Sequence, residues 1–262
     1  MPDTYSHGHH ESVLRSHRNR TVENSAAYLI PHLRPGLDVL DVGCGPGSIT
    51  VDLAARVAPG RVIGIDAADD AIAAARALGA EGVTFAVGDA YNLGAPDASF
   101  DVVHAHQVLQ HLTDPVAALR EWRRVLKPGG VVAARDGVYS SFAWYPADPV
   151  LDRWLALYHE LTDHNAAEAD AGVFLPHWAA EAGFDDVAFS ASNWAYATPE
   201  TRQWWGGLWA DRALESSFAT QTLEYGLTTP GELEEIAAAW RRWAAQPGAS
   251  FIVVHGEVIC RK

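Results

Sequence analysis

Three glycines and one carboxylate stand close together in the segment Val39-Leu40-Asp41-Val42-Gly43-Cys44-Gly45-Pro46-Gly47. The segment runs from a short apolar stretch into a predicted helix over residues 48–57. Glycine is needed where the backbone takes a positive φ or must approach a ligand closely. A loop between a strand and a helix also lies at the helix N-terminus, which favours electronegative groups of a ligand. The segment therefore predicts a ligand-binding loop.

The charge of Asp41 in this segment indicates which kind of ligand the loop binds. A dinucleotide loop follows the pattern G-x-G-x-x-G/A. Here Gly43, Gly45 and Gly47 are more closely spaced, and Ser48 takes the third position of that pattern. Asp41 would repel a pyrophosphate, whereas a carboxylate suits the sulfonium and ammonium groups of S-adenosylmethionine. The loop thus predicts S-adenosylmethionine and disfavours an NAD-dependent oxidoreductase.

Two more acids follow predicted strands. Asp66 ends the next strand, where a carboxylate can accept hydrogen bonds from both ribose hydroxyls. Gly88-Asp89-Ala90 follows the third strand, where Asp89 could accept from an adenine amino group. Both acids could instead be turn formers, but their positions directly after strands favour contact with the ligand.

The elements that must position these groups alternate along the chain from Asp38 to about Asp136. Short apolar runs predict strands over 38–42, 62–66, 84–87, 100–104 and 131–134, and helical patterns lie between them over 48–57, 69–78 and 115–126. This alternation is typical of βαβ units and a parallel sheet with helices on both faces.

Five stretches resemble the class I methyltransferases, and more narrowly the methyltransferase-11 group that includes the ubiquinone and menaquinone C-methyltransferases. They are VLDVGCGPG (39–47), VIGID (62–66), GDA (88–90), FDVVHAHQVLQHLTDP (100–115) and LREWRRVLKPGG (119–130). The resemblance implies an α/β fold with a doubly wound, mostly parallel sheet of seven strands, Rossmann-like in topology, in which the last strand is antiparallel. It also implies a cofactor at the carboxyl ends of the first strands.

The resemblance assigns roles to single residues. Gly43, Gly45 and Asp41 would hold the methionine part of the cofactor, Asp66 the ribose, and Asp89 with Ala90 the adenine. The residue after the fourth strand, His106 or Gln107, would close over the methionyl end. With their neighbours, the expected cofactor-binding residues are Asp41, Gly43, Cys44, Gly45, Asp66, Ala67, Gly88, Asp89, Ala90, His106 and Gln107.

The chain changes character after residue 140. Apolar stripes predict helices that begin near Pro149 and Pro230, and strand candidates lie at 186–190 and 251–260. We therefore expect an N-terminal helical lid over 1–36, a cofactor-binding core over 37–140, and a tryptophan-rich helical cap with the final strands over 141–262. Core packing explains most of the tryptophans, but the run from Trp204 to Trp209 with two glycines could form a wall for a flat or apolar substrate.

Methyl transfer from a sulfonium needs mainly positioning and exclusion of water. A base is required only if the acceptor is a hydroxyl or an acidic carbon. The candidate catalytic residues are His106, His111 and Asp136, with His159 and His177 as further base candidates. The candidate substrate contacts are Tyr139, His177, Trp204 and Trp209, and Asp136 and Tyr139 rank first because they follow the fifth core strand.

Composition limits the partners. The 262 residues carry a net charge of −14, which argues against a nucleic-acid partner. Arg120, Arg123 and Arg124 are interpreted as a solvated helix face. No apolar run approaches the roughly 20 residues of a membrane span, and the two cysteines form no disulfide framework, so we expect a cytoplasmic protein, monomeric or homodimeric.

The twelve histidines suggest a metal site, but the chain has no H-E-x-x-H or C-x-x-C spacing, and we expect no metal. If the N-terminal segment covers the site, Tyr5, His9 and Leu14 would lie near the ligand.

The predicted function is transfer of a methyl group from S-adenosylmethionine, leaving S-adenosylhomocysteine. The acceptor would be a small aromatic or apolar metabolite, methylated on O, N or C, in specialised metabolism. Two alternatives remain open: C-methylation of a quinone precursor, and a catalytically silent protein that binds the cofactor.

Overall fold

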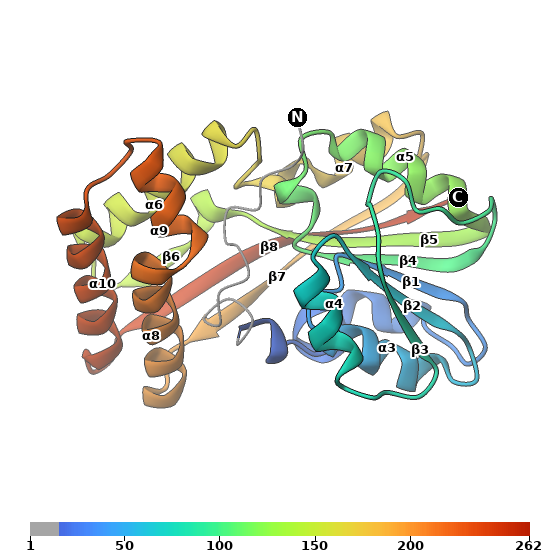
Figure 1. Cartoon of the computed structure of the whole chain (residues 1–262), viewed down its shortest axis with the longest axis horizontal. Helices are drawn as coiled ribbons and strands as arrows, with labels where there is room; N and C mark the ends of the chain where they lie inside the picture. Colours follow the sequence, from blue (N-terminus) through green and yellow to red (C-terminus); the bar gives the residue numbers. More distant parts are fainter. Residues whose placement is uncertain (1–15) are drawn as a thin grey trace.

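Five parallel strands form the first half of a single sheet in the computed structural model, which describes residues 16–262 (Figure 1). The order across the sheet is β3-β2-β1-β4-β5-β8-β6, and β7 pairs with the other edge of β8. The parallel strands are β1 (Val39–Val42), β2 (Val62–Asp66), β3 (Val83–Val87), β4 (Phe100–His106) and β5 (Leu126–Gly137).

The second half of the sheet is built around β8 (Ser250–Arg261), which runs antiparallel to β5. Both β6 (Ala143–Tyr145) and β7 (Asp186–Tyr196) pair antiparallel with β8. The expected antiparallel last strand is therefore confirmed. The described chain has eight strands rather than seven, because β6 adds three residues along the edge of β8 beyond β5.

Helices cover both faces of this sheet. On one face α2 (Val22–Ser25), the 3₁₀ helix η1 (Ala27–His32) and α3 (Ser48–Val57) bury residues such as Leu29 and Leu53 against β1, β4 and β5. On the other face α5 (Pro115–Val125) and α7 (Ala171–Glu181) bury Trp122 and Leu175. The helix α4 (Asp69–Arg76) packs on β3. Short 3₁₀ helices η2 (Leu109–His111) and η3 (Tyr139–Ser141) follow β4 and β5.

The helical cap lies where β7 and β8 extend beyond the parallel strands (Figure 1). It consists of α6 (Pro149–His164), α8 (Pro199–Glu215), α9 (Ser217–Glu224) and α10 (Pro230–Ala245). Trp154 is at its centre, edge-on to the rings of Trp209 and Trp240 at 4.6 and 4.9 Å between centroids. Phe251 of β8 packs on Trp240 at 5.3 Å, so the strand itself enters the core of the cap.

No helix formed by residues 16–262 combines the length and apolar character that crossing a bilayer requires.

The two adjacent glycines of α8 give a matched test of this packing. A Cβ on Gly206 would lie 2.8 Å from both the Ala244 Cβ and the Trp240 carbonyl oxygen of α10. A Cβ on Gly207 would meet no atom of the described part of the chain within 4 Å. Gly206→Ala should lower the free energy of unfolding by about 1–3 kcal/mol through overpacking. Gly207→Ala should raise it by up to about 1 kcal/mol, because glycine is a poor helix former. Urea denaturation of both variants measures the difference, and equal effects would contradict the close approach of α8 to α10.

Candidate functional site

A cavity of about 1650 Å³ opens at the carboxyl ends of β1 to β4 and reaches the helices of the cap. All eleven residues expected to bind the cofactor line it. So do His111, Tyr139, Trp204 and Trp209, whereas Asp136, His159 and His177 do not. The structure thus brings the sequence motifs together in one place and extends that place into the cap.

The three glycines of the binding loop each have a positive φ, 65° at Gly43, 54° at Gly45 and 83° at Gly47. A Cβ on Gly43 would lie 2.4 Å from the Val108 side chain, and one on Gly47 would lie 2.7 Å from Phe85. Packing therefore requires glycine at these two positions. A Cβ on Gly45 would instead lie 3.5 Å from the His17 ring nitrogen, so this glycine faces the N-terminal segment.

Asp41 is buried beneath the loop and both of its oxygens have partners. One accepts a hydrogen bond from the Thr50 hydroxyl at 2.6 Å, and the other lies 2.7 Å from Nδ1 of His104. The carboxylate therefore anchors the loop to the sheet while it also lines the cavity. The charge of Asp41 also acts on the cavity-lining residue Cys44. Burial is the main cause that raises the pKa of the Cys44 thiol, and the charges of Asp41 and Asp66 raise it further.

Asp66 joins the end of β2 to the same loop. It accepts hydrogen bonds from the backbone N–H of Gly45 at 2.9 Å and of Ala68 at 3.0 Å, one on each oxygen. Asp89 accepts from the N–H of Tyr91 at 2.8 Å. A carboxylate has about four acceptor positions, so these turn contacts leave capacity for the hydroxyl and amino groups of a ligand.

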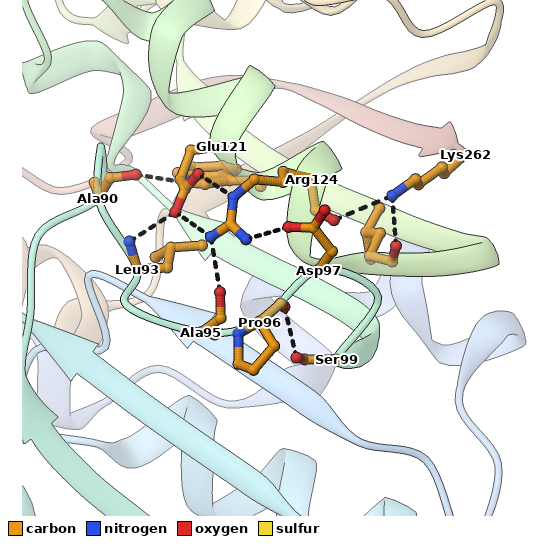
Figure 2. A network of polar contacts seen from close by, with 11 residues as sticks. Ala90, Leu93, Ala95, Pro96, Asp97, Ser99, Glu121, Arg124 and Lys262 are labelled. Atoms are coloured by element: carbon orange, nitrogen blue, oxygen red, sulfur yellow. Dashed lines mark hydrogen bonds and ion pairs between the residues drawn. The ribbon is translucent and has the colours of Figure 1, made fainter.

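The segment after β3 that carries Asp89 is held by α5. The Trp122 indole donates to the Ala90 carbonyl at 3.0 Å, and Glu121 accepts from the Leu93 N–H at 2.9 Å. Arg124 binds Glu121, Asp97 and the Ala95 carbonyl (Figure 2). Arg124 therefore ties this segment to α5, although its side chain is still 36% exposed on the helix face that was expected to be solvated. The other two arginines of the group also have internal contacts, Arg120 with the Glu181 carbonyl and Arg123 with the Phe184 ring.

Strand alternation corrects the expectation for Asp136. His106, Arg135 and Glu257 are register partners across β4, β5 and β8, so their side chains share the face that borders the cavity. Asp136 points to the opposite face, where it is fully buried and accepts from the Gln110 N–H at 3.1 Å. Burial raises the pKa of Asp136 to about 7. It does not line the cavity and is not placed to act on an acceptor.

His177 is the second residue that the structure places elsewhere. It lies on the outer side of α7, where its side chain is 66% exposed and 3.6 Å from Glu181. His159, on α6, contacts Ser140 outside the cavity. Neither ring therefore lies in the cavity. Tyr5, His9 and Leu14, expected near the ligand, lie outside the described residues.

His106 is the histidine best placed for chemistry. It is 5% exposed, lines the cavity, and neither ring nitrogen has a hydrogen-bond partner among the described residues. Its ring lies 5.7 Å from that of Trp194. Burial and then the charges of Arg20 and Arg135 lower its pKa well below the usual value, which keeps the imidazole neutral. His111 also lines the cavity, with its ring nitrogen 3.1 Å from the Gln110 amide.

Gln107, the next residue, has an unusual backbone for a non-glycine residue, with φ at 56°. Its N–H donates to the Arg135 carbonyl at 2.7 Å and its amide donates to His255 at 3.1 Å. Its side-chain oxygen accepts from Arg20. These contacts on both sides hold Gln107 in the strained conformation directly beside the glycine loop.

Aromatic side chains form the far end of the cavity. Tyr196 stacks on Trp205 at 4.4 Å, and Tyr139 is stacked at 4.0 Å on Tyr158 behind it. Sequence reasoning missed several residues that line this end, among them Arg20, Trp194, Tyr196 and Arg212. The sequence contains a pattern that could have indicated three of these residues. Arg212 lies three residues after Trp209 on the same helix face, and Trp194 and Tyr196 continue the alternation of the strand that was expected to end at residue 190.

Among residues 16–262, no three His, Cys, Asp or Glu side chains are placed to hold a metal ion. The loop does fit S-adenosylmethionine. Open backbone at Gly45, the acids at the ends of β1 and β2, and Asp89 after β3 surround one end of the cavity.

Comparisons with known proteins agree with this geometry. A family model described as a methyltransferase domain matches residues 40–134. The chain is 34% identical over 271 residues to an uncharacterised methyltransferase of Schizosaccharomyces pombe, covering 98% of this chain and 96% of the relative. It is 31% identical over 282 residues to a probable methyltransferase of Aspergillus luteorubrus, covering 99% and 98%. Its fold is similar to that of phosphoethanolamine N-methyltransferase 2 of Haemonchus contortus in complex with S-adenosyl-L-methionine, with a TM-score of 0.56, 19% identity, and coverage of 91% of this chain and 52% of that one.

The buried Asp136 predicts a pH-dependent stability. Its pKa in the fold, about 7, lies above the ordinary value of 3.8. Its contribution to stability is therefore fully present below about pH 4 and is lost as the pH rises through about 7. Asp136→Asn has no proton to lose, so its free energy of unfolding relative to the original chain should rise by about 2–3 kcal/mol between pH 5 and pH 8. Urea denaturation at the two pH values measures this, and a constant difference would show that Asp136 does not ionise in this range.

Proposed function

The chain belongs to the class I S-adenosylmethionine-dependent methyltransferases, and we propose that it methylates a small acceptor with a flat, largely apolar body. One observation carries the proposal: the cavity that begins at the glycine loop also has the rings of Tyr139, Trp194 and Trp204 in its wall. Aromatic side chains present large apolar faces that favour flat ligands. The net charge of −14 and the internal contacts of the arginines on α5 support a metabolite rather than a nucleic acid as substrate.

The residues at the loop end would hold the donor. Asp66 and Asp89 present acceptor oxygens to the ribose and adenine, and Gln107 is fixed beside the loop. When bound, S-adenosylmethionine supplies an already activated methyl group. The chain therefore contributes mainly position and exclusion of water. The aromatic wall and the cavity-lining residues Ser16, His17, Asn19 and Arg20 contribute to both.

His106 would contact the acceptor. A neutral, buried imidazole that has no hydrogen-bond partner among residues 16–262 can accept the proton of an acceptor hydroxyl or orient an acceptor by a hydrogen bond. Its neutrality follows from its burial and the nearby arginine charges. Five residues were candidate bases: His106, His111, Asp136, His159 and His177. Of these five, all of which the structure describes, only His106 and His111 line the cavity.

The cofactor role of Asp66 gives a direct test. Asp66→Ala should weaken S-adenosylmethionine binding by about 1–3 kcal/mol, because hydrogen bonds to a charged acceptor are lost. The exposed Asp69→Ala, three residues on and outside the cavity lining, is the matched control and should bind like the original chain. Isothermal titration calorimetry measures both. Unchanged affinity of Asp66→Ala would refute its role, and tight NAD binding without S-adenosylmethionine binding would refute the proposed function.

Turnover separates an enzyme from a silent binding protein. We expect S-adenosylhomocysteine to form when the protein is incubated with S-adenosylmethionine and a panel of aromatic hydroxyl compounds, including hydroquinones. With any hydroxyl acceptor that reacts, His106→Ala should lower kcat by about 100-fold or more. His177→Ala, on the exposed side of α7, is the control and should react normally. Cofactor binding without turnover on any acceptor would favour the silent binding protein.

A further inference from the structure

A fully buried histidine lies behind the acidic end of the cavity. His104 of β4 is 0% exposed, and its Nδ1 lies 2.7 Å from an oxygen of Asp41. Its other ring nitrogen is buried and has no hydrogen-bond partner among residues 16–262. A buried polar group without a partner destabilises a fold, and an apolar side chain of similar size would avoid that cost. The bond to Asp41 is therefore the observed interaction that explains a histidine at this position.

This side-chain bond is not needed to join the two strands. The backbones of β1 and β4 already pair in parallel, from Val39 with Val102 to Val42 with Ala105. Asp41 and His104 are register partners within that pairing, so their side chains project from the same face of the sheet. Because the backbone sets the register, the effect of the side-chain bond falls on the carboxylate.

Both oxygens of the Asp41 carboxylate are held from behind. The Thr50 hydroxyl of α3 donates to one oxygen at 2.6 Å, and His104 holds the other. Because a carboxylate only accepts hydrogen bonds, Nδ1 of His104 carries the hydrogen. Asp41 lines the cavity, whereas Thr50 and His104, both 0% exposed, are not among the described residues that line it. A carboxylate has about four acceptor positions, so two donors fix its orientation and leave positions for a ligand.

The charge of Asp41 is directed at the cavity. Within residues 16–262, no lysine or arginine forms an ion pair with Asp41 or with the other acids of this end, Asp66 and Asp89. Burial and then the charges of Asp41 and Asp66 raise the pKa of the Cys44 thiol, which also lines the cavity. The negative charge therefore acts on the space in which S-adenosylmethionine, with its sulfonium and ammonium groups, would bind.

We propose that His104 is a positioning residue for the methyl donor: together with Thr50 it holds the carboxylate of Asp41 toward the cationic methionyl end of S-adenosylmethionine. This inference rests on the proposed methyltransferase function and goes beyond it, because His104 acts on the donor only through Asp41. Hydrogen bonds to a charged acceptor are short and strong. A group that is held in place before the ligand arrives binds it with a smaller loss of conformational freedom.

Three ligands separate this role from a general effect on the fold. S-adenosylmethionine carries an ammonium and a sulfonium group, S-adenosylhomocysteine carries the ammonium group alone, and 5′-methylthioadenosine shares the adenosine and sulfur but has neither cation. His104→Leu removes the donor to Asp41 and keeps a side chain of similar size. It should lower the affinity for S-adenosylmethionine by about tenfold or more and leave that for 5′-methylthioadenosine within about twofold of the original value.

Isothermal titration calorimetry measures all three affinities. The result for S-adenosylhomocysteine shows which cation Asp41 faces. A loss like that of S-adenosylmethionine assigns the ammonium group, and an unchanged affinity assigns the sulfonium group.

Conservative and control variants accompany His104→Leu. His104→Asn carries an amide nitrogen on the carbon that bears Nδ1 in histidine, so it should retain most of the affinity for S-adenosylmethionine. Thr50→Val removes the donor to the other oxygen of Asp41 and keeps the shape. It should cause the same selective loss, which tests the proposal even if His104→Leu does not fold. Val103→Ala truncates the neighbouring buried residue on the opposite face of β4 and should leave all three affinities unchanged.

A double-mutant cycle tests whether His104 acts through Asp41. Asp41→Asn should by itself lower the affinity for S-adenosylmethionine. Adding His104→Leu to it should cause a further loss of about twofold or less, because residues that act through one shared interaction have non-additive effects.

The outcomes distinguish the positioning role from the methyltransferase function. Four results would overturn the positioning role: unchanged S-adenosylmethionine affinity in His104→Leu, an equal loss for 5′-methylthioadenosine, an affinity of His104→Asn as low as that of His104→Leu, or additive losses in the double variant. Each of them leaves the original chain able to bind S-adenosylmethionine, so the proposed function would stand. An original chain that binds neither S-adenosylmethionine nor S-adenosylhomocysteine would instead refute the proposed function itself.

Discussion

The length of β8 is the constraint on which the site depends. One end of the strand pairs with β5 beside the parallel core, and the other end carries Phe251 into the tryptophan cluster of the cap. A single hydrogen-bonded strand therefore fixes the distance and angle between the glycine loop and the aromatic wall. Because β7 follows β8 over its whole length, Trp194 and Tyr196 are carried to the cavity by the same pairing.

Successive side chains of each strand point to opposite faces of this sheet, and this alternation separates the charged groups. His106, Arg135 and Glu257 fall on one face and Asp136 on the other. On the cavity face, Arg135 forms an ion pair with Glu257 at 3.1 Å. On the far face, Asp136 is buried away from the cavity. A shift of register by one residue would exchange these roles.

Much of the core was predictable because its motifs are local. The glycine loop, the acids after β2 and β3, and the order of strands and helices depend on residues close in sequence, and the structure places every expected cofactor residue in the lining of the cavity. The sequence predicted the position of a side chain less well where that position depends on which face of a strand or helix the residue occupies, or on pairing between segments far apart in the chain. Arg135, not Asp136, is the cavity-facing residue of β5, and His177 lies on the outer side of α7. Arg20 and Arg212 were missed because these residues, far apart in sequence, reach the cavity lining only through the tertiary fold.

The helix α8 contributes both to the packing of the cap and to the wall of the cavity. At Gly206 one side of the helix packs so closely on α10 that a methyl group would clash. Trp205, Trp209 and Arg212 line the cavity from this helix. Any change that moves α8 relative to α10 would therefore move the aromatic ring and the guanidinium group together. Acceptor recognition in this chain should thus be sensitive to packing in the cap, at positions that never touch the ligand, while the donor end, built on β1 and β2, should be largely insensitive to it.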